Sequence, residues 1–169
     1  LFRELDGLCA PHAIFASNTS SLAVGDMAAS TKRPQNFVGL HFFNPVPLMK
    51  LVEVVRTLET SDAVFAEACA FGAKVGKTVV RAKDTPNFIA NRVGIFGMLA
   101  TMVEAEKFGL SVDLVDDLTG AKLGRAKSGT FRTADVVGLD TMGHVIKTMQ
   151  DTLADDPFFS VYKTPEVLA

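Results

Sequence analysis

The sequence has few of the features that would place it in a specialised class of protein. It contains two cysteines, Cys9 and Cys69, which lie far apart and are interpreted as small buried thiols of a reducing compartment, not as a disulfide or metal site. A net charge of −2 gives no general affinity for nucleic acid. No apolar run reaches the roughly 18 residues of a membrane helix, because Arg92, Glu104 and Glu106 interrupt the best candidate.

A glycine-rich nucleotide-binding turn is also missing. No Gly-x-Gly-x-x-Gly pattern occurs anywhere in the chain, so the usual first half of a nucleotide-binding sheet is absent. The chain begins at Leu1, without Met, on a helix that is already under way. We therefore expect this sequence to be part of a longer protein. Its composition, 48% hydrophobic and 21% charged, is ordinary for a soluble globular protein.

The first half of the chain alternates between predicted strands and helices. Short apolar runs predict strands, and capped segments with helical periodicity predict helices. Ser20 and Ser21 are the predicted N-cap residues of the second helix, and Ser61 of the third. The strands are expected over residues 13–17, 37–43, 51–55 and 78–81, and the helices over 1–8, 22–29 and 61–75. This alternation predicts an α/β sheet, too short to be a complete doubly wound domain.

The second half reads as helix throughout. Thr85 as N-cap and Pro86 at the first helical position predict a helix over residues 86–108. Apolar residues surround its first four turns, which predicts a central, buried helix. Further helices are expected over residues 112–119 and 139–153, with a short turn opening at Thr133 or Asp135. We place one domain over residues 1–83 and an all-helical domain over residues 84–169.

His41 and Glu53 are titratable residues inside two apolar strands. Burying either group alone costs several kcal/mol, comparable to the net stability of a domain. Twelve positions apart on consecutive strands, they can relieve that cost by pairing. His41 could instead be a core histidine bonded to backbone, and Glu53 an edge-strand residue facing water. If Glu53 accepts from one imidazole nitrogen, the other can take a proton, as in a general base.

Polar residues at the ends of the predicted strands are candidates for ligand binding. Asn18, Ser20 and Asn44 occupy such positions, where open α/β sheets bind their ligands. Ser20 could equally serve only as a helix cap. Asn91 lies in the predicted buried helix, and its amide needs a partner, which could be Asn87 or a bound ligand.

A basic loop follows in the helical half. Lys122, Arg125 and Lys127 lie between Gly120 and Gly129. The loop is interpreted as a solvated connector, with a site for a phosphorylated ligand as the alternative.

Three motifs carry a resemblance to a known family. With their order and spacing, the chain resembles the L-3-hydroxyacyl-CoA dehydrogenases of fatty-acid β-oxidation over essentially its whole length. The motifs are ASNTSSL at residues 16–22, GLHFFNPVPLMKLVEV at 39–54 and KDTPNFIANR at 83–92.

The resemblance implies a fold and a set of roles. It implies the C-terminal part of a Rossmann-type NAD-binding domain, followed by the start of a helical dehydrogenase C-terminal domain. His41, Glu53, Ser20 and Asn91 would form the active site, with Ser20 and Asn91 also binding the substrate. Asn18 and Asn44 would lie near the nicotinamide ribose of the cofactor, NAD.

The resemblance also implies partners. The substrate would be an acyl-CoA thioester, and the helical domain would pair two copies as a homodimer. No nucleic-acid partner, membrane span or metal is expected. A bacterial protein of this kind would be cytoplasmic, and a eukaryotic one would lie in the mitochondrial matrix.

The chain departs from the family pattern at two places. The family usually has Gly where this chain has Asn87. In the short dehydrogenases a Gly-Pro pair precedes Val-Gly-Leu-Asp, whereas residues 127–140 read KSGTFRTADVVGLD, which resembles the longer bacterial enzymes fused to an enoyl-CoA hydratase module. Two alternatives to an active dehydrogenase stay open: a binding module that keeps the fold without the chemistry, and a structural or dimerising fragment.

Overall fold

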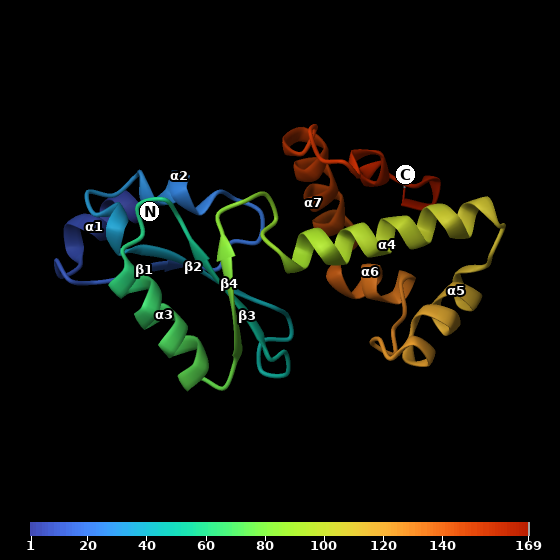
Figure 1. Cartoon of the computed structure of the whole chain (residues 1–169), viewed down its shortest axis with the longest axis horizontal. Helices are drawn as coiled ribbons and strands as arrows, with labels where there is room; N and C mark the ends of the chain where they lie inside the picture. The colour runs from blue at the N-terminus through green and yellow to red at the C-terminus, as the bar shows by residue number, and fades with distance from the viewer. Residues whose placement is uncertain (169) are drawn as a thin grey trace. The chain divides into compact units, whose positions relative to one another are not determined.

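The computed structural model describes residues 1–168 and divides the chain into two compact units, Leu1–Ile89 and Ala90–Ala169. The first unit is built around a sheet, and the second is helical (Figure 1). The prediction of an α/β part followed by an all-α part is confirmed. No helix in residues 1–168 is long and apolar enough to cross a membrane.

The sheet of the first unit has four strands in sequence order. They are β1 (Phe15–Ser17), β2 (Phe37–Phe42), β3 (Leu51–Arg56) and β4 (Thr78–Lys83). β1 and β2 are parallel, β2 and β3 antiparallel, and β3 and β4 parallel. The carboxyl ends of β1 and β2 therefore lie at the same edge of the sheet as the amino end of β3.

Helices cover both faces of this sheet. Side chains alternate between faces along a strand, so one face presents Phe37 and Val55, and the other presents Val38 and Val54. The first face packs with α1 (Phe2–Leu8) and α2 (Val24–Ala28), and a short helical turn, η1 (Pro34–Asn36), precedes β2. The second face packs with α3 (Asp62–Lys74), whose N-cap is Ser61, as predicted.

The start of α2 differs from the prediction. Ser20 and Ser21 do not cap it; its N-cap is Ala23, which supplies no side-chain hydrogen bond. The carboxylate of Asp84 takes that role instead, accepting from the amides of Val24 at 2.9 Å and Gly25 at 2.7 Å. A residue 60 positions away thus satisfies amides that a local serine was expected to bind.

Residues 84–89 also depart from the prediction, because the predicted helix does not begin at residue 86 and this segment is not helical. The long helix α4 begins at Ala90 and ends at Lys107. Asn87 and Phe88 have φ angles of 58° and 51°, in the left-handed region, which interrupts helical geometry after Pro86. Glycine enters this region without cost and asparagine tolerates it, so the backbone at this position is compatible with Asn87.

The helical unit contains an apolar core cluster that includes Leu99, Met142 and Met149. Its elements are α4 (Ala90–Lys107), α5 (Val112–Thr119), η2 (Ala121–Leu123), α6 (Phe131–Val137), α7 (Leu139–Thr152), η3 (Phe159–Tyr162) and η4 (Glu166–Leu168). The prediction that α4 is buried on all sides is wrong. Ile95, Leu99 and Met102 enter the core, whereas Val93 and Val103 are 67% and 40% exposed.

The predicted turn at Thr133 or Asp135 is instead helix α6, and a remote carboxylate holds its first turn. Asp116, on α5, is 6% exposed and accepts from the amides of Phe131 at 2.6 Å and Arg132 at 3.1 Å. A carboxylate in this position satisfies two amides that no intrahelical carbonyl reaches, and it faces the positive end of the helix dipole.

Asp116→Ala is therefore expected to lower the free energy of unfolding of the helical unit by about 1–2 kcal/mol, the loss typical of an N-cap. Urea unfolding followed by circular dichroism measures this change. Asp113→Ala is the matched control, because Asp113 is exposed on the same helix. Equal stability of the two variants would contradict the capping role.

Candidate active site

His41 and Glu53 form a buried pair on neighbouring strands. The antiparallel register of β2 and β3 places them directly opposite each other. The Nδ1 atom of His41 lies 2.8 Å from Oε2 of Glu53, a hydrogen-bond distance. Their side chains are 5% and 0% exposed, so the predicted pairing of these two residues is present in the structure, and Glu53 does not face water.

The face of the sheet explains why the pair is buried. His41 follows Phe37 and Gly39 on the face that α2 covers. Gly39 allows a close approach there, because a Cβ at this position would lie 2.7 Å from Cβ of Val55 and 3.1 Å from Cγ2 of Val24. Any larger residue at position 39 would push α2 away from the strand that carries His41.

Aromatic rings and a backbone amide complete the surroundings of the pair. The ring of Phe43 lies 4.4 Å from that of His41, and the ring of Phe88 lies 5.5 Å away. The second oxygen of Glu53, Oε1, accepts from the amide of Ile89 at 3.0 Å. Both carboxylate oxygens are thus engaged, which holds the carboxylate in one orientation.

This arrangement determines which nitrogen of His41 can react. A carboxylate only accepts hydrogen bonds, so in the neutral imidazole the proton resides on Nδ1, facing Glu53. Nε2 then carries the lone pair, and within residues 1–168 no hydrogen bond to Nε2 is formed. Nε2 is therefore the atom that can take a proton from a ligand.

The other strand-end candidates lie at the same sheet edge. Asn18 follows β1, and its Oδ1 accepts from the amide of Phe42 at 2.8 Å, which ties the end of β1 to the end of β2. Ser20 is half-buried in the turn after Asn18, and Asn44 is exposed two residues beyond β2. Asn18 thus lies at the end of a strand, as the sequence predicted, and its hydrogen bond to Phe42 was not predicted.

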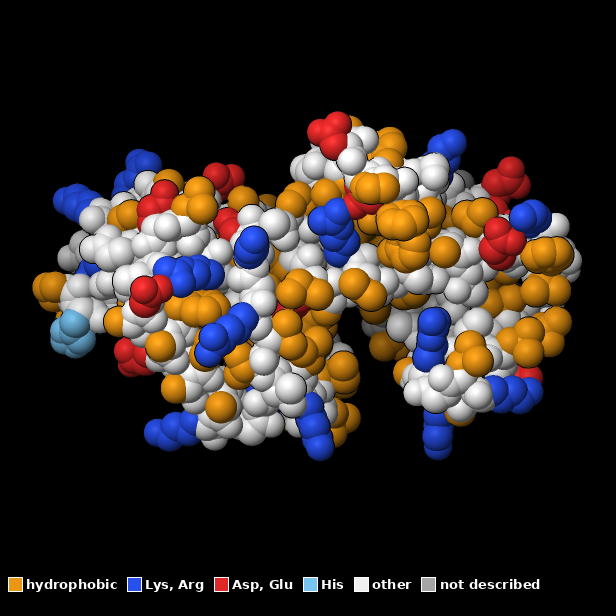
Figure 2. Space-filling model, in the orientation of Figure 1, with side chains coloured by type: hydrophobic (Ala, Val, Ile, Leu, Met, Phe, Trp, Pro, Cys, Tyr) orange, Lys and Arg blue, Asp and Glu red, His pale blue; other side chains and the backbone are white. Residues whose placement is uncertain are grey.

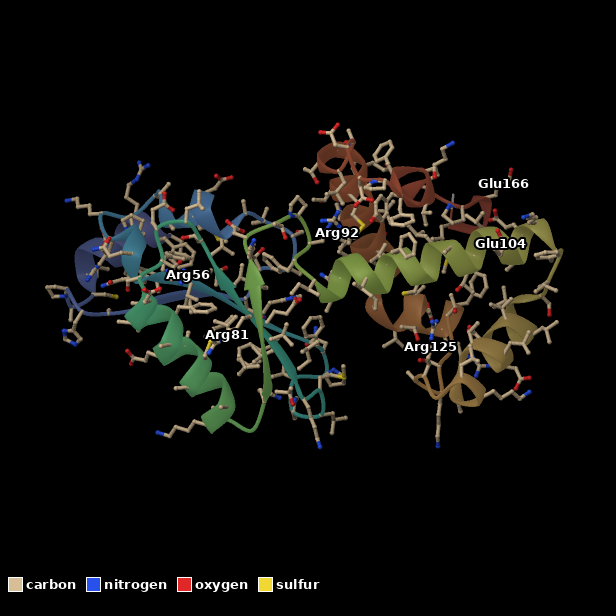
Figure 3. The ribbon with its side chains drawn as sticks, in the orientation of Figure 1. Arg56, Arg81, Arg92, Glu104, Arg125 and Glu166 are labelled. Carbon is tan, nitrogen blue, oxygen red and sulfur yellow. The ribbon has the colours of Figure 1, made fainter. Side chains whose placement is uncertain are left out.

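Asn91 lies in the other unit, in the first turn of α4, where it is half-buried. Its neighbour Arg92, labelled in Figure 3, forms an ion pair with Asp156. The pKa of the Asp156 carboxyl is lowered below its usual value by the amide of Phe158 and by Arg92. The structure thereby gives Arg92, for which the sequence assigned no role, an acidic partner.

Two further contacts were invisible to sequence reasoning. Asp84 and the amide of Ile89 both reach the site region from one segment, and neither has a sequence signal beyond the motif in which it lies.

In the basic loop, Lys122 pairs with Asp117, and Arg125 and Lys127 are exposed. Residues 1–168 hold no cluster of three or more metal-ligating side chains.

The groups at the sheet edge fit the nicotinamide end of a dinucleotide. They are neutral amides and a hydroxyl, which match ribose hydroxyls and a carboxamide, while the nearby carboxylates of Glu53 and Asp84 are each engaged in hydrogen bonds within the chain. Asn18 retains its amide NH₂ as a donor while its oxygen binds Phe42. The arrangement therefore suits a cofactor whose reactive ring lies beside His41.

Comparisons with known proteins agree with this picture. The model for the 3-hydroxyacyl-CoA dehydrogenase NAD binding domain matches residues 1–85, and the model for the C-terminal domain of the same enzymes matches residues 88–168. A Bacillus subtilis protein named "Probable 3-hydroxyacyl-CoA dehydrogenase" is 47% identical over 92% of this chain and 20% of its own length. The mitochondrial hydroxyacyl-coenzyme A dehydrogenase of Sus scrofa is 43% identical over 94% of this chain and 50% of its own.

A solved structure is similar along nearly the whole chain. The (S)-3-hydroxybutyryl-CoA dehydrogenase PaaH1 of Ralstonia eutropha superposes with a TM-score of 0.88 and 33% identity, covering 98% of this chain and 57% of that one. The chain thus spans between a fifth and somewhat more than half of the length of these relatives.

Proposed function

The chain belongs to the 3-hydroxyacyl-CoA dehydrogenase family, and we propose that the full-length protein oxidises L-3-hydroxyacyl-CoA thioesters to 3-ketoacyl-CoA with NAD, as a step of fatty-acid β-oxidation. The observation that supports this best is the buried hydrogen bond of His41 to Glu53, which leaves Nε2 as a proton acceptor. A purely structural ion pair does not require that this second nitrogen be left without a hydrogen bond in the described residues.

His41 acts as the general base. Its Nε2 accepts the proton of the substrate's 3-hydroxyl while the bond from C3 to its hydrogen breaks and the carbonyl forms. Glu53 keeps the acceptor on Nε2 and stabilises the imidazolium that results. When bound, NAD supplies the acceptor for the hydride that leaves C3.

The polar residues around His41 orient the reactants. Ser20 donates its hydroxyl to the substrate oxygen, a preorganised contact that lowers the cost of reaching the transition state. Asn18 and Asn44 would hold the nicotinamide end of the cofactor through their amides. Asn91 contributes a substrate-binding amide, a role that rests on the family resemblance.

A turnover assay tests the proposal. The full-length polypeptide is expected to form NADH from NAD and L-3-hydroxybutyryl-CoA, and to consume NADH with acetoacetyl-CoA. The D-enantiomer serves as control, because a site that places one face of C3 toward His41 discriminates between the two. A folded protein with no turnover would favour the alternative of a binding module without chemistry.

The helical unit supports a second role, self-association into a homodimer. Large apolar side chains remain exposed on α4, α5 and the turn between them, and Figure 2 shows hydrophobic side chains over this unit. Phe108 is 67% exposed, and Leu114 and Leu118 on α5 are 43% and 45% exposed. So much apolar surface on one unit is typical of a protein interface.

Light scattering at micromolar concentration is expected to give twice the chain mass. Leu114→Lys combined with Leu118→Lys should shift the mass toward that of one chain, because two charges on one face of α5 oppose burial. Leu58→Lys is the control, since Leu58 is a fully exposed leucine of the first unit. A wild-type chain of single mass would contradict the homodimer.

The cellular location follows from the same assignment. A bacterial source implies the cytoplasm, and a eukaryotic source implies the mitochondrial matrix; the name of the Sus scrofa relative includes the word mitochondrial.

A further inference from the structure

The segment of residues 84–89, called the clasp below, contacts three parts of the proposed site. Its first residue, Asp84, accepts hydrogen bonds from the first amides of α2. Phe88, which is 3% exposed, packs its ring 5.5 Å from that of His41. Its last residue, Ile89, donates its amide to Glu53 at 3.0 Å.

The turn that carries Ser20 is bound at both ends, by Asn18 at its start and by Asp84 at its end. At one end, Asn18 accepts from the amide of Phe42, next to His41 in β2. Within the turn, Thr19 accepts from the amide of Leu22 at 3.0 Å. At the other end the turn continues into α2, whose amino end is bound to Asp84.

The hydrogen bonds of the second anchor come from the carboxylate of Asp84. α2 has no capping side chain of its own, and it is five residues long, so it has little intrinsic stability. The contact is also tight, because a Cβ at Gly25 would lie 3.1 Å from Oδ2 of Asp84. Gly25 has an ordinary helical backbone, so space for the carboxylate, not backbone freedom, is what glycine provides here.

From these contacts we propose that Asp84 is a positioning residue of the proposed reaction. Its carboxylate binds the amino end of α2 and thereby fixes the position of the turn that carries Ser20. The same clasp contacts His41 through Phe88 and Glu53 through Ile89, so it sets the position of the turn relative to these two residues. The inference rests on the proposed function and extends it to a residue that does not touch the reacting atoms. When a mutation far from the chemistry displaces a catalytic group by about 1 Å, the reaction rate can fall by on the order of 10²-fold.

The first test replaces Asp84 in the full-length polypeptide. Asp84→Asn keeps the size of the side chain but places an amide NH₂ group against the backbone N–H of Val24 or of Gly25. The two-oxygen anchor is therefore lost. The variant is expected to lower kcat with acetoacetyl-CoA by about 10- to 100-fold, with an unchanged KM for NADH and an unchanged shape of the pH profile. Asp26→Asn, an exposed carboxylate on the same helix, is the control and should keep wild-type kcat.

Gly25→Ala separates positioning from plain stability. Alanine is a better helix former than glycine, so a merely structural view predicts unchanged or raised thermal stability and unchanged turnover. The positioning role predicts a lower kcat in a folded, stable protein, because the new methyl displaces the Asp84 carboxylate. In an Asp84→Ala background, Gly25→Ala should have no further effect, since nothing is left to displace.

The outcomes distinguish this inference from the proposed function. If the wild-type protein shows no turnover, the proposed function fails. If it turns over and Gly25→Ala and Asp84→Asn match it, the proposed function stands and the role of Asp84 is overturned. If Asp84→Asn does not fold, Gly25→Ala alone decides: wild-type kcat overturns the role, and reduced kcat with retained thermal stability supports it.

Discussion

His41→Gln is expected to lower kcat of the full-length polypeptide with acetoacetyl-CoA and NADH by about 10²–10⁴-fold, the range for loss of a general acid–base group. Glutamine has similar reach, and its amide can donate to Oε2 of Glu53, so the buried carboxylate keeps a partner. It has no group that exchanges a proton near neutral pH. Steady-state kinetics measure the loss, and NADH affinity, determined by fluorescence, should change little.

The control for this variant is His12→Gln, because His12 is an exposed histidine of the same unit. Its kcat should equal that of the wild type, which excludes a general effect of removing an imidazole. Wild-type turnover in His41→Gln would contradict the assignment of the base and leave the His41–Glu53 pair as a structural feature. Thermal unfolding of both variants shows whether a loss comes from chemistry or from misfolding.

The sequence predicted this pair because its signal is energetic and local. Two ionisable residues within apolar strands need a partner, and consecutive strands offer one. The strands themselves were equally visible, since short apolar runs such as residues 37–40 are typical of strands with both faces covered. What the sequence could not give was the register that sets His41 opposite Glu53, which depends on the antiparallel pairing of β2 with β3.

The errors of prediction share a different cause. Ser20 and Ser21 matched the pattern of a local helix cap, but Asp84 binds the amino end of α2 from 60 residues away. Thr85-Pro86 matched a helix start, yet the left-handed backbone at Asn87 delays α4 to Ala90. Capping rules describe neighbours in sequence, so a carboxylate brought by the fold replaces a local cap without leaving any local signal.

Glu53 is the second residue whose replacement should have a large effect, although it does not touch the substrate in the proposed mechanism. The Glu53→Gln substitution keeps the size of the side chain and replaces one of its two hydrogen-bond-accepting oxygens with an NH₂ donor. Its single oxygen can serve the amide of Ile89 or the Nδ1–H of His41, but not both. If the oxygen faces Ile89, the NH₂ group faces Nδ1, and the imidazole proton moves to Nε2.

With its proton on Nε2, His41 can no longer accept the substrate's proton, so kcat is expected to fall by about 10³–10⁴-fold, as when the orienting carboxylate of a catalytic triad becomes an amide. Ring-nitrogen NMR shifts of His41 report the tautomer directly and would not move if Glu53 only filled space. Glu67→Gln, an exposed glutamate on α3, is the matched control. A Glu53→Gln protein with wild-type kcat and an unshifted tautomer would show that burial, and not proton placement, is what Glu53 provides to His41.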